Sequence, residues 1–70
     1  MSISNERFRE NVRARRLSLG WTQSKAADRL GVSQPQWAYI ESGRNIPTLA
    51  MVDRVAAALN TTPEKLITNK

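Results

Sequence analysis

Apolar residues recur at steps of three or four along most of the chain, and this spacing indicates amphipathic helices rather than strands. A first helix is expected over about 4–19, and one of its faces is formed by Phe8, Val12, Arg16 and Leu19. Gly20 follows, and a glycine can take the left-handed conformation that ends a helix. The periodicity therefore predicts an N-terminal helix with a mostly apolar inner face.

Four further helices are expected, each opened by a serine or threonine that can accept a hydrogen bond from a free backbone N–H. Their caps are Thr22, Ser33, Thr48 and Thr62. Their inward-facing residues are expected to be Ala26, Ala27, Leu30, Trp37, Ile40, Leu49, Val52, Val55, Ala56, Leu59, Leu66 and Ile67. Since no linker or repeat separates them, the segments predict an all-α fold, a compact five-helix bundle that forms one domain over 1–70.

Only Gly31 and Val32 separate the second helix from the third, which ends at Gly43. A connection this short, with a glycine that tolerates positive φ, forces a sharp angle between the two helices. Pro35 stands in the first turn of the third helix, where its missing N–H costs nothing, so it marks a helix start rather than a break. This is the layout of a helix-turn-helix, whose second helix can enter a DNA major groove.

The 70 residues carry 11 lysines and arginines against 6 aspartates and glutamates, a net charge of +5. This balance, with a pI near 10.8, favours an acidic partner, and nucleic acid over a membrane. The absence of cysteine and histidine excludes disulfides, Cys/His zinc sites and a histidine proton shuttle. The few carboxylates do not converge, and the chain has no nucleophile–base pair or glycine-rich phosphate loop. We therefore expect no catalytic residue, no metal site and no cofactor, and the chain is not expected to be an enzyme.

The N-terminal residues lack the apolar stretch of a secretory signal, and no apolar run is long enough to cross a membrane. Together with the absence of cysteine, these features indicate a cytoplasmic protein.

The outer face of the third helix offers base-reading chemistry. Gln34 and Gln36 each carry a donor and an acceptor, so each can bind adenine N6 and N7 at once. Tyr39 follows Gln36 by three residues and can add a base-edge or phosphate contact. The alternatives are glutamines that are merely solvated, and a Tyr39 that packs on the loop before the fourth helix.

Groups that can hold the DNA backbone flank this face. The second helix begins at Thr22 and Gln23, and its free N–H groups and positive dipole end suit a phosphate. Arg44 and Asn45, just beyond the third helix, can hold the backbone as well. The outer arginines of the first helix are interpreted as a solvated face. None of the following is assigned to DNA: Arg7, Arg9 and Arg13.

Residues from the second helix to the loop before the fourth match a known pattern. The matching positions are Thr22, Gln23, Ala27, Gly31, Val32, Ser33, Ile40, Glu41, Gly43 and Pro47. In this combination the chain resembles, over nearly its whole length, the phage repressor/Cro-like helix-turn-helix domains, also called the XRE family. The resemblance implies a lambda-repressor-like fold, binding to double-stranded DNA, usually as a symmetric dimer, and regulation of transcription.

The resemblance also marks positions at or beside the DNA. With the two helix caps included, these are Thr22, Gln23, Ser33, Gln34, Pro35, Gln36, Tyr39, Arg44 and Asn45. Pro35 departs from the polar readers of the family, since it can offer only an apolar contact, such as one to a thymine methyl group.

Two core features follow from the comparison with the family. It implies an ion pair between Arg16 and Glu41, which we interpret as structural. Trp37 and Ala26 depart from the pattern, which usually has isoleucine or valine at the first position and leucine at the second. Tryptophan is larger than the usual residue and alanine is smaller, so we expect the indole to fill the space that the leucine would have taken. The alternative is a partly exposed Trp37 that stacks on DNA or on a partner.

These features predict a sequence-specific DNA-binding transcriptional regulator that represses transcription, or otherwise regulates it, by occupying promoters. Its operator is expected to be an inverted repeat bound by a homodimer, weak off DNA, that uses Leu66 and Ile67 near the C-terminus. For Leu66 the alternative is a place in the monomer's own core. The alternatives for the function are an antitoxin that also binds a toxin or other protein partner, a controller of a restriction-modification system, and the DNA-binding fragment of a longer regulator.

Overall fold

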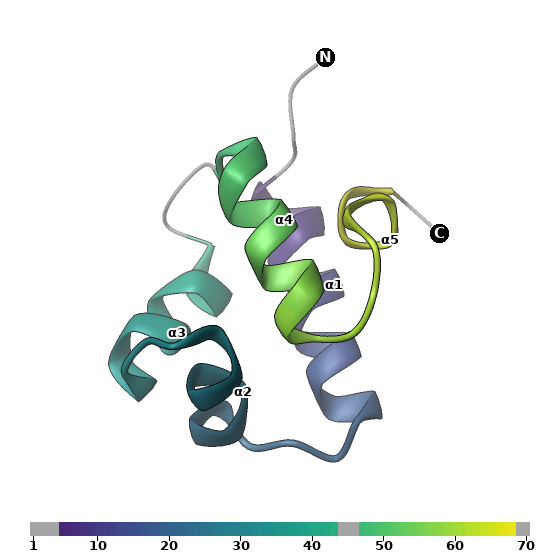
Figure 1. Ribbon diagram of the computed structural model, residues 1–70. Helices are drawn as coiled ribbons and strands as arrows, with labels where there is room; N and C mark the ends of the chain where they lie inside the picture. Colours follow the sequence, from purple (N-terminus) through teal and green to yellow (C-terminus); the bar gives the residue numbers. More distant parts are fainter. Residues whose placement is uncertain (1–4, 44–46, 69–70) are drawn as a thin grey trace.

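The computed structural model describes residues 5–43 and 47–68, and in these ranges the chain forms five helices and no strand. They are α1 (Asn5–Ser18), α2 (Gln23–Leu30), α3 (Gln34–Ser42), α4 (Leu49–Ala58) and α5 (Pro63–Ile67). Figure 1 shows α3 and α5 on opposite sides of α4, with α2 beside α3. The all-α five-helix fold expected from the sequence is confirmed. None of the described helices has the length and apolar character of a membrane span.

Hydroxyl side chains cap three of the four helices for which a cap was expected; the exception is α5, where Thr62 stands at the N-cap but its side chain makes no capping hydrogen bond. Oγ1 of Thr22 accepts a hydrogen bond from the Lys25 N–H at 3.1 Å, and Oγ of Ser33 accepts one from the Gln36 N–H at 3.2 Å. Thr48 caps α4 in the same way. Each bond satisfies a backbone donor that the first turn of a helix leaves without a helical partner. Local sequence therefore sets where α2, α3 and α4 begin.

The turn between α2 and α3 depends on Gly31, whose φ is +85°. The carbonyl of Ala27 accepts from the N–H groups of Gly31 at 2.8 Å and of Val32 at 3.0 Å, which closes the end of α2. A Cβ at position 31 would meet open space. Glycine is thus required here by the backbone conformation and not by crowding.

One apolar core joins all five helices. Its buried members are Phe8, Val12, Ala26, Ala27, Leu30, Trp37, Val52, Val55, Ala56, Leu59 and Leu66. Trp37 is 0% exposed and Ala26 lies in the same cluster, as expected for an indole that fills the space of a missing leucine. The alternative of a partly exposed Trp37 is therefore wrong. Ile40 and Ile67 are half-buried against this core.

Leu49 was expected on the inner face of α4, and this expectation is wrong, because its side chain is 71% exposed. Leu49 is the first residue of α4, and the buried stripe of that helix begins only at Val52. Helical spacing identifies a face, but it does not say how far along the helix the neighbouring elements reach.

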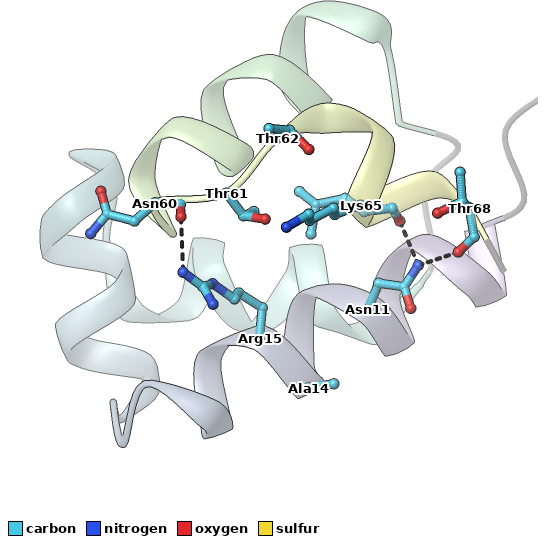
Figure 2. Close-up of a pocket in the computed structure, with 9 residues that line it drawn as sticks. Asn11, Ala14, Arg15, Asn60, Thr61, Thr62, Lys65 and Thr68 are labelled. Atoms are coloured by element: carbon cyan, nitrogen blue, oxygen red, sulfur yellow. Dashed lines mark hydrogen bonds between the residues drawn. The ribbon is translucent and has the colours of Figure 1, made fainter. Parts of the chain in front are cut away.

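Polar side chains of α1 fasten the C-terminal part of the chain (Figure 2). Arg15 donates from Nε to the Leu59 carbonyl at 2.9 Å and from Nη2 to the Asn60 carbonyl at 2.8 Å. Asn11 Nδ2 donates to the carbonyls of Leu66 and Thr68 at 2.9 and 3.0 Å. These bonds satisfy carbonyls at the ends of α4 and α5. Asn11 and Arg15 both line a hollow between α1 and the C-terminal residues, and their hydrogen bonds hold α5 against α1.

Candidate nucleic-acid interface

The structure separates the two faces of α3 as expected from the sequence. Gln34, Pro35 and Gln36 are exposed, and Tyr39 is 48% exposed, whereas Trp37 points into the core. The exposed side chains lie within two turns of one another on a short helix. This face, defined by Gln34, Pro35, Gln36 and Tyr39, is called the outer face of α3 below.

Gln36 has a structural task that the sequence analysis did not assign. Its Oε1 accepts from the Ser33 N–H at 3.0 Å, while Ser33 Oγ accepts from the Gln36 N–H, so the two residues form a reciprocal capping box. The spacing of a serine and a glutamine three residues apart is a readable signal for such a box. Because its carbonyl oxygen is engaged here, Gln36 is less available than Gln34 for a bidentate base contact, and base reading by Gln36 stays a prediction.

The carboxylate of Glu41 gathers donors from three helices. Arg16 Nε donates to Oε2 at 2.6 Å and Arg16 Nη2 to Oε1 at 3.2 Å, which confirms the expected ion pair. The Trp37 indole N–H donates to Oε2, and Gln23 Nε2 donates to Oε1 at 3.1 Å. The side chain of Glu41 is only 6% exposed, so these bonds replace the water that burial removes.

A further hydrogen bond carries this network to the surface. Gln34 Nε2 donates to Gln23 Oε1 at 2.8 Å. The chain of contacts therefore runs from the buried Arg16–Glu41 pair, through Gln23 at the start of α2, to Gln34 at the start of α3. We call these four residues the glutamine relay. It ends on the outer face of α3.

The donors also explain the electrostatics of Glu41. Burial raises the pKa of its carboxyl, but the hydrogen bonds from Arg16, Trp37 and Gln23, with the charge of Arg16, outweigh burial and hold the pKa below its ordinary value. Glu41 therefore stays ionised at neutral pH. An ionised carboxylate only accepts hydrogen bonds, which fixes the direction of every bond that it makes.

Two hydrogen bonds of this network were not predicted from the sequence. Trp37 and Glu41 are four residues apart on one helix, so their contact could have been found from helical spacing. The bond from Gln23 to Glu41 joins residues 18 apart on different helices, and no local pattern signals it. The contact of Gln23 with Glu41 could therefore be identified only once the packing of the helices was known.

Of the remaining predicted contact residues, the structure describes Thr22 and Ser33, which are the N-caps of α2 and α3. Thr22 caps α2, and its exposed position leaves α2's start facing solvent beside Gln23. The half-buried Trp21 ring, next to Thr22 in the sequence, has the Lys25 ammonium 5.9 Å and the Arg29 guanidinium 5.3 Å from its centroid. Arg44 and Asn45 lie outside the described residues.

Arg9 is not a simply solvated residue, in contrast to its interpretation from sequence. A Cβ at position 43 would stand 2.3 Å from Arg9 Cδ, so the half-buried Arg9 side chain crosses the glycine that ends α3. Gly43 also has φ +76°. Glycine is required at 43 both by backbone conformation and by this close approach.

Comparison with known proteins agrees with this arrangement. A model of the helix-turn-helix domain family matches residues 7–66. An uncharacterised HTH-type transcriptional regulator from Methanothermobacter thermautotrophicus is 39% identical over 52 residues, which cover 74% of this chain and 75% of the relative.

Solved structures share the fold. A hypothetical transcription factor from Neisseria, NHTF, matches with a TM-score of 0.85 at 25% identity, over 93% of this chain and 75% of that chain. The restriction-modification controller protein C.AhdI from Aeromonas hydrophila matches with a TM-score of 0.79 at 24% identity, over 90% and 91% of the two chains, a likeness in fold alone. Since the family match spans most of the chain and the relative is a transcriptional regulator by name, the chain belongs to the helix-turn-helix family of DNA-binding transcriptional regulators.

Proposed function

We propose that this protein is a sequence-specific regulator of transcription, expected to repress, that reads the major groove of double-stranded DNA with the outer face of α3. The observation that carries the proposal is the glutamine relay. A buried, ionised carboxylate is connected by directed hydrogen bonds to an exposed amide at the start of α3. A merely solvated glutamine needs no such support, whereas a base-reading side chain benefits from being held in one orientation.

The relay assigns a direction to each amide. Glu41 can only accept, so Gln23 turns its Nε2 inward and its Oε1 outward. Gln34 must then donate one N–H to Gln23, which leaves it one N–H and its Oε1 for a partner. One donor beside one acceptor matches adenine, which offers N7 and N6–H₂ in the major groove. Guanine offers two acceptors, N7 and O6, and would need two donors from Gln34.

Gln23→Leu is therefore expected to relax the choice of adenine over guanine at the base pair that Gln34 reads. Without its partner, Gln34 can rotate its amide, so the preference should fall by about 1 kcal/mol, or roughly fivefold. The measurement is the affinity for duplexes that differ at this base pair alone, with Ser24→Ala, an exposed neighbour on α2, as the control. An unchanged preference in Gln23→Leu would show that the relay does not set specificity.

The other predicted residues would position the protein on the backbone. Thr22 and Ser33 stand at the starts of α2 and α3, where helix N-termini suit phosphates. Arg44 and Asn45 are proposed, from sequence, to hold phosphate beyond α3. The net charge of +5 supports binding to a polyanion in general, and we infer a cytoplasmic, nucleoid-associated location from this function.

A second copy is proposed for site selection, because α3 has nine residues and reads only a few base pairs. Leu66 was one expected interface residue, but it is 1% exposed and belongs to the core, which leaves the half-buried Ile67. So small an apolar contribution supports a homodimer that is weak in solution and assembles on an inverted-repeat operator.

Selection of bound duplexes from a random pool tests the proposed function. We expect enrichment of an inverted repeat whose half-sites lie about 10 bp apart. Flat enrichment would overturn sequence-specific binding. An enriched site without symmetry, bound by one copy, would overturn the dimer alone.

Control of a restriction-modification system is an alternative that the likeness in fold to C.AhdI keeps open, since C.AhdI is matched over 91% of its length. It differs from general repression in the genes controlled and not in the chemistry of DNA reading. No contact in the described residues favours an antitoxin over either.

A further inference from the structure

The hollow between α1 and the C-terminal residues is lined by positively charged side chains and by no acidic one. Its volume is about 720 Å³, which lies within the range of small-molecule sites. Arg15 of α1 and Lys65 of α5 are the charged residues among the nine that line it (Figure 2). Five of the others carry amides or hydroxyls: Asn11, Asn60, Thr61, Thr62 and Thr68. Two cations on one hollow, without a carboxylate in its lining, favour an anion between them.

The guanidinium of Arg15 is held in place and still has donors to spare. Of its five N–H groups, one on Nε and one on Nη2 donate to the carbonyls of Leu59 and Asn60. The other three have no partner among the described residues. Because the two bonds fix the half-buried side chain, a ligand would find the remaining donors already oriented.

The ammonium of Lys65 supplies the second charge. Figure 2 shows this side chain extending from α5 over the hollow, toward the side on which Arg15 lies. In the part of the chain that the structure describes, the ammonium makes no hydrogen bond and no ion pair. Its three N–H donors are therefore free to meet a ligand.

The hollow lies away from the proposed DNA-reading surface. It is built by α1 and by the segment that contains α5, and α3 and α5 are on opposite sides of α4 (Figure 1). A duplex read by the outer face of α3 therefore does not supply the anion. A small molecule that diffuses in can do so.

We propose that this hollow binds a small molecule through a phosphate group. A phosphate monoester carries a charge of about −1.5 to −2 at neutral pH and offers three strong acceptor oxygens, which suits two cations with several free donors. Arginine in particular matches the geometry of phosphate oxygens. The hollow is larger than a phosphate group, so the rest of the ligand has room beside the hydroxyls of Thr61 and Thr62. The inference does not depend on DNA reading.

Titration with inorganic phosphate, with chloride at equal ionic strength as the comparison, tests the site at neutral pH. Amide signals in two-dimensional NMR spectra report where the anion binds. We expect phosphate, and not chloride, to shift the signals of Thr61, Thr62 and Lys65 in a saturable way. Ribose 5-phosphate should shift the same signals and bind at least as tightly, because the ester keeps the phosphate group and adds contacts.

Lys65→Gln is expected to weaken phosphate binding about fivefold, the upper end of what one exposed ion pair contributes. Lys25→Gln is the matched control, because it removes the same charge from an exposed position of α2 that does not line the hollow. It should keep the wild-type affinity. Ala14→Glu places a carboxylate at an exposed lining position and should abolish the shifts, since the cations then face a fixed anion.

Each contrary outcome has a definite meaning. The absence of saturable shifts, or shifts at the starts of α2 and α3 instead of α5, would overturn the site. Equal affinities of Lys65→Gln and Lys25→Gln would overturn it too. Inorganic phosphate that binds more tightly than ribose 5-phosphate would overturn the small-molecule ligand. Because no DNA is present, none of these results bears on the proposed function.

Discussion

Replacing Trp37 by alanine is expected to lower the free energy of unfolding by about 3–5 kcal/mol, the usual cost of removing a buried aromatic ring. Among the described residues, Trp37 is the largest side chain that is fully buried. Its removal leaves a cavity in the core and takes a donor away from Glu41. Because the total stability of a small domain is about 5–15 kcal/mol, the variant is expected to be poorly folded.

Denaturant unfolding followed by far-ultraviolet circular dichroism measures this loss. Trp37→Ile combined with Ala26→Leu should recover much of the stability, because the two side chains share one buried cluster and their volumes then compensate. Leu17→Ala, at an exposed position of α1, is the control and should change little. An unfolding midpoint in Trp37→Ala equal to that of the wild type would contradict the core role of the indole.

Arg16→Met is expected to cost a similar amount, about 3–5 kcal/mol near neutral pH, because it leaves the buried carboxylate of Glu41 without its cation. The guanidinium supplies two of the hydrogen bonds to that carboxylate and a third, from Nη1, to the Trp21 carbonyl at 2.8 Å. Arg13→Met, at an exposed position of the same helix, removes an arginine without unpairing a buried charge. It should be nearly neutral.

The cost of Arg16→Met should depend on pH. In the wild type the pKa of Glu41 lies below its ordinary value of 4.5, so the folded protein binds this proton less readily than the unfolded chain. The stabilising contribution is therefore complete above about pH 4.5 and is lost as the pH falls through the lowered pKa. At low pH a protonated Glu41 needs no cation. The loss of stability in Arg16→Met, relative to the wild type, should therefore shrink as the pH is lowered from neutral through 4.5. Denaturant unfolding of both proteins over this pH series measures it, and a loss that is equal at every pH would contradict the ion pair's role.

Much of the fold could be predicted because its determinants are local. The hydroxyl caps at Thr22, Ser33 and Thr48 and the left-handed glycines set the helix ends, and the three-to-four spacing identified most buried residues. The spacing failed at Leu49, where burial depends on whether another helix reaches the first turn of α4. That is a property of the packed chain and not of the segment.

The residues of the candidate site could be predicted from the sequence, but the hydrogen bonds that connect them could not. The outer face of α3 followed from periodicity, and the Arg16–Glu41 pair followed from resemblance to the family. The bonds from Gln34 to Gln23 and from Gln23 to Glu41 join residues that come together only when α1, α2 and α3 pack. Burial of Arg9 against Gly43 is another contact between distant segments, and it was missed for the same reason.

The central claim is that the outer face of α3 reads bases, and Gln34→Ala tests it most directly. The measurement compares dissociation constants of the wild type and the variant on the selected duplex and on a random duplex of equal length, at one salt concentration. The account predicts a loss of about 1–3 kcal/mol on the selected site and almost none on the random duplex. Equal losses on the two duplexes would show that Gln34 contributes only general affinity, and would contradict the account.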